Sequence, residues 1–159
     1  MDNLAGRPVE KLMVERAKAE DVPVLRQMVD AAYSKYIERL GKPPAPMNAD
    51  YGKLLKTQNV YVLRIGGRVV GSILLSRDGD AIKVNNLVVD PSAQGRGYGR
   101  VLMDYAEDMA RAQGLAAVTL FTNEKMHENI ALYTKIGFRE TGRKAEDGFN
   151  RVFFRKNLA

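Results

Sequence analysis

The 159-residue chain lacks several residue types on which common active sites depend. It contains no cysteine, which excludes disulfide bonds, thiolate metal sites and a cysteine nucleophile. Its single histidine, His127, leads us to expect no metal site built on histidines. No apolar run approaches the roughly 18 residues of a membrane span, and the first residues show no signal-peptide pattern. We therefore expect a cytoplasmic protein with neither a metal nor a membrane partner.

Acidic residues are fewer than basic ones. The chain has 25 lysines and arginines against 19 aspartates and glutamates, a formal net charge of +6. This balance favours an anionic partner such as nucleic acid, a phosphorylated cofactor or an acidic substrate. The basic residues are scattered and are not interleaved with aromatic residues in one patch, so we expect no nucleic-acid partner.

Hydrophobic periodicity predicts an α+β fold in a single domain over residues 1–159. Strands are expected at 12–18, 60–65, 68–75, 82–89, 117–121, 138–141 and 151–155. Helices are expected from 21 to 37 or 40, and at 49–57, 101–113 and 127–136. In the third helix, Glu107 and Arg111 are expected to pair on the solvent face. Hairpin turns at 66–67 and 78–79 make most of the sheet antiparallel.

The stretch DPSAQGRGYGR, residues 90–100, follows an apolar strand and precedes a helix. It fails as a dinucleotide fingerprint because Arg100 stands where the last glycine belongs, and it lacks the Gly-Lys-Ser/Thr of a Walker loop. A helix start offers unpaired N–H groups at the positive end of the helix dipole, and glycines let an anion approach the backbone. Arg96 and Arg100 can add charge-assisted contacts. The stretch therefore predicts an anion-binding loop.

The wider stretch LVVDPSAQGRGYGRVLM resembles the acyl-CoA-binding motif of the GNAT acyltransferase superfamily, Gln/Arg-x-x-Gly-x-Gly/Ala, which residues 94–99 match in full. A later stretch, NEKMHENIALYTKIGF, resembles the second family motif through Asn129, Tyr133 and the pair at 137–138. The resemblance implies a GNAT-type central mixed, mostly antiparallel sheet of about seven strands with roughly four helices on both faces. It also implies an N-acetyltransferase that moves an acetyl group from acetyl-CoA directly to an amine.

The same resemblance implies where acetyl-CoA or coenzyme A binds. The pyrophosphate would lie on the backbone of 94–100, and the pantetheine arm would lie along the preceding strand, which splays away from strand 117–121. Tyr133 would be catalytic, its hydroxyl donating to the sulfur as the thiolate leaves. The cofactor-binding residues would be Leu87, Val88, Val89, Gln94, Gly95, Arg96, Gly97, Tyr98, Gly99, Arg100, Asn129 and Tyr133.

The chain differs from some family members in the residue that would serve as general base. Those members carry a glutamate on the strand that enters the motif. Here that strand reads IKVNNLVVD, with Lys83, Asn85 and Asn86 and no carboxylate before Asp90. A water chain or an acceptor that arrives neutral is therefore the favoured alternative, and His127 is a weaker candidate for the base.

The variable segment 33–51 is expected to roof the acceptor pocket. The predicted substrate residues are Tyr33, Tyr36, Glu38 and Asn86. Glu38 or Asp50 would hold an amine, and Arg39 a carboxylate. A small amine or amino-acid-like molecule is the favoured acceptor. A protein or peptide N-acetyltransferase and a non-catalytic acyl-CoA-binding module remain alternatives, and both monomer and homodimer stay open.

Overall fold

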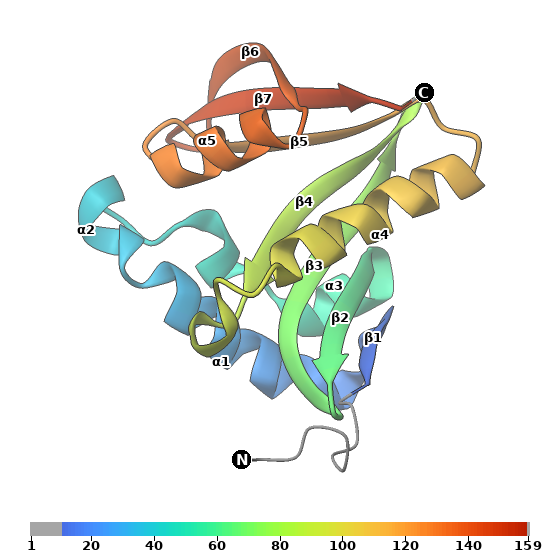
Figure 1. Ribbon diagram of the computed structural model, residues 1–159. Coiled ribbons are helices and arrows are strands. Elements are labelled where there is room, and N and C mark those ends of the chain that lie inside the picture. Colours follow the sequence, from blue (N-terminus) through green and yellow to red (C-terminus); the bar gives the residue numbers. More distant parts are fainter. Residues whose placement is uncertain (1–10, 159) are drawn as a thin grey trace, which may run out of the picture.

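The computed structural model describes residues 11–158 as a seven-stranded mixed sheet with helices on both faces (Figure 1). The strand order is β1-β2-β3-β4-β5-β7-β6. The strands are β1 Leu12–Arg16, β2 Asn59–Ile65, β3 Arg68–Asp78, β4 Ala81–Val89, β5 Ala117–Asn123, β6 Arg139–Glu146 and β7 Phe149–Asn157. The α-helices are α1 Val22–Tyr33, α2 Tyr36–Leu40, α3 Tyr51–Thr57, α4 Tyr98–Ala112 and α5 His127–Lys135. Short 3-10 turns occur at η2 Ala19–Asp21, η3 Ala45–Asn48 and η4 Pro91–Ala93. The predicted fold class is confirmed.

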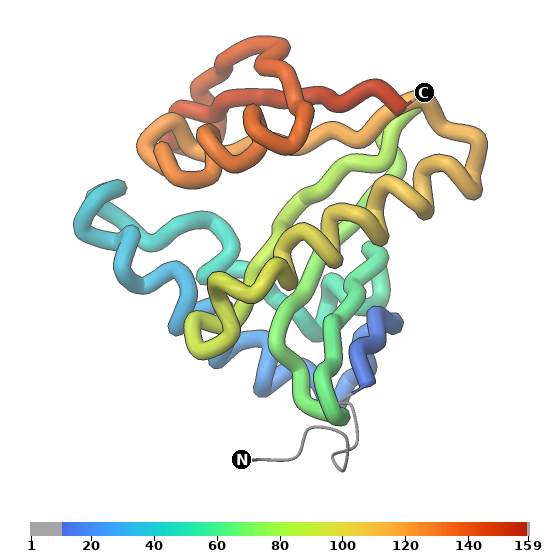
Figure 2. The backbone as a smooth tube through the Cα atoms, viewed as in Figure 1, coloured from blue at the N-terminus to red at the C-terminus, as the bar shows by residue number. Residues whose placement is uncertain are grey.

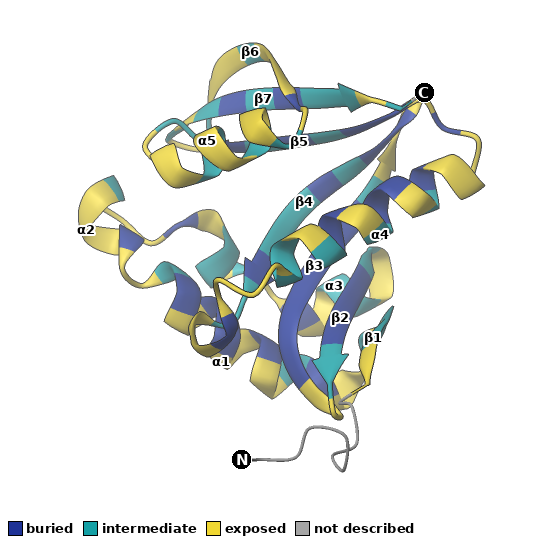
Figure 3. Ribbon diagram, in the orientation of Figure 1, coloured by how far each residue is buried: buried dark blue, intermediate teal, exposed yellow. Residues whose placement is uncertain are grey.

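Two apolar clusters fix the layers on either side of the sheet. On one face α4 and α5 cover a core that includes Leu63, Ile73, Leu102, Phe138 and Phe154. On the other face α1 and α3 cover a core that includes Leu25, Met28, Tyr51, Val62 and Val88. Figure 3 shows these buried residues running along β2, β3 and the inner side of α4. None of the helices within residues 11–158 is long and apolar enough to cross a membrane.

The sheet opens where β4 meets β5. These two strands are parallel and pair only from Ala81–Ala117 to Val84–Leu120. Next to that point β4 carries a bulge, because Leu74 of β3 pairs with Asn86 whereas Leu75 pairs with Val84. A bulge bends its strand and increases the local twist. Figure 2 shows β4 and β5 side by side near the C-terminus and then diverging, as the resemblance implies.

The expected first helix is interrupted, which corrects the prediction of one helix over 21–40. α1 ends at Tyr33 and α2 begins at Tyr36, with Ser34 and Lys35 between them. The break lets the ring of Tyr36 become buried and its hydroxyl reach Glu128 on α5, at 3.3 Å. A fifth α-helix results.

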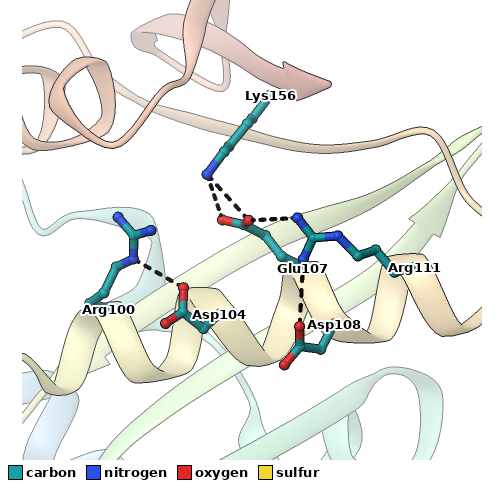
Figure 4. Close-up of polar contacts among 6 residues, drawn as sticks. All are labelled: Arg100, Asp104, Glu107, Asp108, Arg111 and Lys156. Carbon is teal, nitrogen blue, oxygen red and sulfur yellow. Dashed lines mark hydrogen bonds and ion pairs between the residues drawn. The ribbon is translucent and has the colours of Figure 1, made fainter. Parts of the chain in front are cut away.

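The predicted pair of Glu107 and Arg111 is present, but Glu107 does not lie on the solvent face as expected. Its side chain is only 6% exposed, and its carboxylate lies 3.0 Å from the Nζ of Lys156 on β7. Arg111 stands farther away, at 3.7 Å (Figure 4). Helical spacing correctly places Glu107 near Arg111, but it does not show that β7 brings a lysine onto the same face.

Candidate active site

A pocket occupies the opening between β4 and β5. Its walls come from α1, α2, the proline-rich segment, β4, β5, α5 and β7. The lining residues are Tyr33, Leu40, Pro44, Ala45, Pro46, Val84, Asn85, Asn86, Leu87, Leu120, Phe121, Thr122, Asn123, Met126, Asn129, Tyr133, Phe149 and Arg151. Arg151 is the single charged residue among them, so no carboxylate or histidine of residues 11–158 lines this pocket.

The glycine stretch forms an exposed loop at the start of α4. Gly97 is the N-cap residue of α4, and both Gly95 and Gly97 have φ +82°, a backbone conformation that favours glycine. A Cβ added to either residue would meet no heavy atom within 4 Å, so the space beside the backbone is open. The first N–H groups of a helix have no intrahelical partner, and they coincide with the positive end of the helix dipole. The loop can therefore accept an anion.

The two arginines beside this loop differ in their contacts. Arg96 is exposed, and Arg100 pairs with Asp104 one turn along α4 at 3.0 Å (Figure 4). Both partners of that pair are about half exposed, with side-chain exposures of 50% and 53%. Such a surface pair is weak, so Arg100 remains free to turn toward an anion.

The outer half of β4 presents backbone groups to the opening. Asp90 N–H donates to the Val70 carbonyl on β3 at 2.8 Å. Because alternate residues in an antiparallel ladder point to opposite edges, the polar groups of Leu87 and Val89 point away from β3. Gln94 Nε2 donates to the Val89 carbonyl at 3.2 Å. This edge can pair with an extended ligand as an added strand would.

Tyr133 lies on α5 one turn after Asn129, and both side chains line the pocket. Its ring packs against Phe138 and Phe154, with centroid distances of 6.0 and 6.1 Å. Its hydroxyl has no hydrogen-bond partner among residues 11–158. Burial raises the pKa of Tyr133 to about 12, so the hydroxyl keeps its proton at neutral pH and can donate it in a hydrogen bond.

Asn129 is held by its neighbours at the start of α5. Its Nδ2 donates to Thr122 Oγ1 at 3.4 Å and lies 3.8 Å from Met126 Sδ. Both contacts are long, and the Oδ1 atom accepts no bond from residues 11–158. Asn129 therefore offers an acceptor to the pocket.

Polar side chains on the side of α1 and α3 form the floor of the opening. The Tyr33 hydroxyl lies 2.8 Å from Asn86 Oδ1 and 3.2 Å from the Leu87 carbonyl, and it can donate to either. Asn86 Nδ2 donates to the Tyr51 hydroxyl at 3.4 Å. Burial raises the pKa of Tyr33 and that of Tyr51, and the bond from Asn86 partly opposes the second shift. Both phenols are neutral at physiological pH.

A roof segment, residues 36–48, crosses from α1 to the other side of the opening. Arg39 pairs with Glu128 at 2.7 Å and donates to the Lys125 carbonyl at 3.2 Å. Lys42 Nζ donates to the Gly148 carbonyl in the β6–β7 turn at 2.6 Å. The hydrogen bond from Arg39 is the main reason that the pKa of Glu128 falls to about 2.

The structure separates the predicted substrate residues into two groups. It brings Tyr33 and Asn86 into the pocket. It places Tyr36 in the roof, bonded to Glu128, and leaves Glu38 exposed and outside the lining residues. Asp50 caps α3 by accepting from Lys53 N–H at 3.2 Å, which is a structural role.

The candidate base His127 is exposed at the start of α5 and does not line the pocket. Residues that sequence reasoning missed include Phe121, Phe149 and Arg151. Phe121 and Arg151 lie on neighbouring strands, and their strand order cannot be read from sequence spacing.

Comparisons with known proteins identify the family. Residues 25–138 match the family model "Acetyltransferase (GNAT) family". The chain is 41% identical over 83 residues to an IAA acetyltransferase of Azospirillum brasilense, covering 51% of this chain and 54% of the relative. It is 31% identical over 135 residues to a glucosamine 6-phosphate N-acetyltransferase of Trypanosoma brucei brucei, covering 72% of this chain and 88% of the relative.

Solved structures share the fold at lower identity. The PaiA N-acetyltransferase of Thermoplasma acidophilum, solved in complex with coenzyme A, superposes with a TM-score of 0.77 at 12% identity, covering 93% of this chain and 99% of that one. The chain spans 54% to 63% of the length of three curated relatives that it matches.

Proposed function

Because this chain belongs to the acetyltransferase (GNAT) family, we propose that it transfers an acetyl group from acetyl-CoA directly to the amine of a small molecule. The observation that supports a small acceptor is the roof. Arg39 and Lys42 tie residues 36–48 to α5 and to the β6–β7 turn, so the acceptor end is a bounded pocket. An open groove would favour a protein tail.

The residues present fit coenzyme A. The loop at 94–100 supplies open backbone N–H groups and two arginines for phosphate oxygens. The edge of β4 at 87–89, whose carbonyls accept from Tyr33 and Gln94, can offer its N–H groups to the amide-rich pantetheine arm, and the Asn129 side chain faces the same opening. Bound acetyl-CoA supplies the thioester whose acyl group is transferred.

In this proposal Tyr133 assists departure of the thiolate. A phenol with a pKa of about 12 does not release its proton to a thiolate of pKa about 8.5, so the hydroxyl acts by hydrogen bonding as charge builds on sulfur. Its lack of a partner among residues 11–158 leaves that bond available.

The acceptor amine must lose a proton without a carboxylate or histidine in the pocket. For an amine of pKa about 10.4, the neutral form costs roughly 4–5 kcal/mol at pH 7. The positive charge of Arg151 disfavours an ammonium ion and so favours the neutral amine. Water held by Asn85, Asn86 and Tyr33 is the route that we propose for the proton.

A screen of acceptors with acetyl-CoA, following thiol release, tests this function. The set contains amino acids, amino sugars, aryl and alkyl amines, a lysine-containing peptide and a peptide with a free N-terminus. We expect small amines to give a kcat/KM at least tenfold above either peptide. A peptide preferred by the same margin would establish the protein or peptide alternative. Acetyl-CoA binding without thiol release for any amine would establish the non-catalytic module.

A further inference from the structure

The acceptor side of the pocket has one charged group and otherwise mostly apolar walls. Leu40, Pro44, Met126 and Phe149 supply apolar surface, and Arg151 supplies the charge. An amine bound by its positive charge needs a carboxylate partner, and none lines the pocket. The charge pattern therefore favours an acceptor that is anionic at some distance from its amine.

Arg151 is held in place before any ligand arrives. Its guanidinium carbon lies 4.4 Å from the centre of the Phe121 ring, and its side chain is only 13% exposed. Nη1 lies 3.3 Å from Glu146, and Nη2 lies 3.7 Å from Asp147, both at the β6–β7 turn. These contacts fix the orientation of the planar group, which lowers the entropic cost of binding a second partner.

The two acidic neighbours of Arg151 leave some of its N–H donors unoccupied. A guanidinium has five N–H donors, and these contacts involve one donor nitrogen each. The contact with Asp147 is long, and that side chain is 81% exposed. Glu146 is also paired with Lys144, at 3.3 Å. Donors of Arg151 therefore remain for a ligand.

Two lysines add positive potential around the pocket. Lys83 lies over the Phe121 ring at 5.2 Å, and Lys42 lies over the Phe149 ring at 4.2 Å. Neither has a carboxylate partner within residues 11–158. A single pocket guanidinium matches a single carboxylate in charge and can bind it in bidentate geometry.

We propose that Arg151 anchors a carboxylate of the acceptor, so that the substrate class is amino acids with an apolar side chain. This inference rests on the proposed function, since it concerns the acceptor of the same reaction. The apolar walls would take the side chain, and the amine would face the opening lined by Asn86 and Tyr133.

Binding of product analogues tests the anchor without requiring turnover. In the presence of coenzyme A, calorimetry compares N-acetyl-L-phenylalanine with N-acetyl-L-phenylalaninamide, which lacks the carboxylate. We expect the wild type to bind the carboxylate form at least tenfold more tightly, and Arg151→Gln to remove this preference. The control is Arg143→Gln on β6, whose side chain is 56% exposed and pairs with Glu140, and which should keep the preference.

A second variant leaves the arginine intact. Glu146→Gln removes the closer acidic neighbour of Arg151, and we expect the carboxylate form to bind more tightly, by about threefold, with the amide unchanged. This result is informative even if Arg151→Gln fails to fold.

Transfer assays separate this inference from the proposed function. We expect Arg151→Gln to lower kcat/KM for L-phenylalanine by more than tenfold, mainly through KM, with little effect on L-phenylalaninamide. Tighter binding of the carboxylate analogue, together with no release of coenzyme A thiol when any amine is supplied, would support the anchor and refute the proposed function.

Three outcomes would overturn the anchor. One is equal binding of the two analogues by the wild type. Another is a preference that survives Arg151→Gln. In the third, the only preference that Arg151→Gln removes is the preference for glucosamine 6-phosphate over glucosamine. That result would make the anchored group a phosphate.

Discussion

The hydroxyl of Tyr133 is the residue-scale feature that distinguishes a catalyst from a binding module. Its ring is fixed by Phe138 and Phe154, so Tyr133→Phe should keep the fold. In the proposed mechanism the hydroxyl contacts the sulfur mainly in the transition state, so its loss should lower kcat about 100-fold with the acetyl-CoA Kd unchanged. Single-turnover kinetics and calorimetry measure the two quantities. A kcat change below threefold with chemistry rate-limiting would remove Tyr133 from the mechanism.

The pH profile provides a second test at the residue scale. The pKa of Tyr133 is raised to about 12, so the hydroxyl remains protonated, and able to donate, at every pH below that value. No carboxylate or histidine of residues 11–158 lines the pocket. We therefore expect kcat/KM to rise with pH up to the pKa of the acceptor amine, and the inflection to move when an acceptor of different pKa is used. An inflection that stays fixed between acceptors would point to a base on the protein.

Two glycines with the same backbone constraint allow the phosphate loop to be tested against a matched control. Gly97 has φ +82°, and Gly79, in the β3–β4 turn, has φ +58°. A Cβ at either position meets no heavy atom within 4 Å. Each alanine variant should therefore lose a similar free energy of unfolding, about 1–2 kcal/mol. Only Gly97→Ala should weaken coenzyme A binding, by more than tenfold. An equal Kd in the two variants would place the cofactor elsewhere.

At the scale of elements, we predict that the ion pair between α2 and α5 helps to keep the roof closed. Arg39 and Glu128 are 39% and 54% exposed, so Arg39→Gln should change the free energy of unfolding by less than about 1 kcal/mol. Hydrogen exchange in residues 36–48 should nevertheless accelerate, and the acceptor KM should rise severalfold. Glu38→Gln, on the exposed side of the same helix, is the control. Equal exchange in the two variants would show that the roof is held by packing alone.

The same ion pair has a defined pH dependence. The pKa of Glu128 is lowered to about 2, from an ordinary value of 4.5. A carboxyl group with a depressed pKa stabilises the folded form above its ordinary pKa, and this contribution is lost as the pH falls toward about 2. The roof should therefore stay docked throughout the physiological range.

Local patterns in the sequence predict the elements well, and the contacts between elements poorly. Alternation and glycine turns locate all seven strands, whereas the helix expected at 101–113 begins earlier, at Tyr98 inside the motif. The break after Tyr33 has no local signal in the sequence, because the contact that accompanies it joins Tyr36 to a residue 92 positions later, on α5. Arg151 was missed for the same reason, since its place in the pocket depends on β7 lying beside β5.

At the scale of the whole molecule, the opening between β4 and β5 divides the sheet into two arms. One arm contains β1 to β4 with α4, and the other contains β5, β7 and β6 with α5 (Figure 1). Four residue pairs of β4 and β5 join them. Glu107 of α4 and Lys156 of β7 add a buried tie between the arms (Figure 4). Gly137, at the end of α5, has φ +105°, and a Cβ there would lie 3.3 Å from Lys156 Cε, so a glycine leaves room for the lysine.

This tie leads to an asymmetric prediction. Lys156→Met leaves the carboxylate of Glu107, 6% exposed, with only Arg111 at 3.7 Å. Breaking a buried pair costs about 3–5 kcal/mol, and we expect about 2–3 kcal/mol here because Arg111 remains. Glu107→Gln should cost less, because the ammonium of Lys156, 19% exposed, can reach water.

The double variant Lys156→Met/Glu107→Leu should recover most of the lost free energy of unfolding, because two apolar side chains can replace a buried ion pair at little cost. Urea denaturation of the wild type, Lys156→Met, Glu107→Leu and the double variant gives the coupling energy, and Arg100→Gln serves as the control for a surface pair on the same helix. Because neither residue lines the pocket, the acetyl-CoA Kd of the double variant should stay within threefold of the wild type. A Lys156→Met variant as stable as Arg100→Gln would show that this ion pair contributes little to holding the arms together.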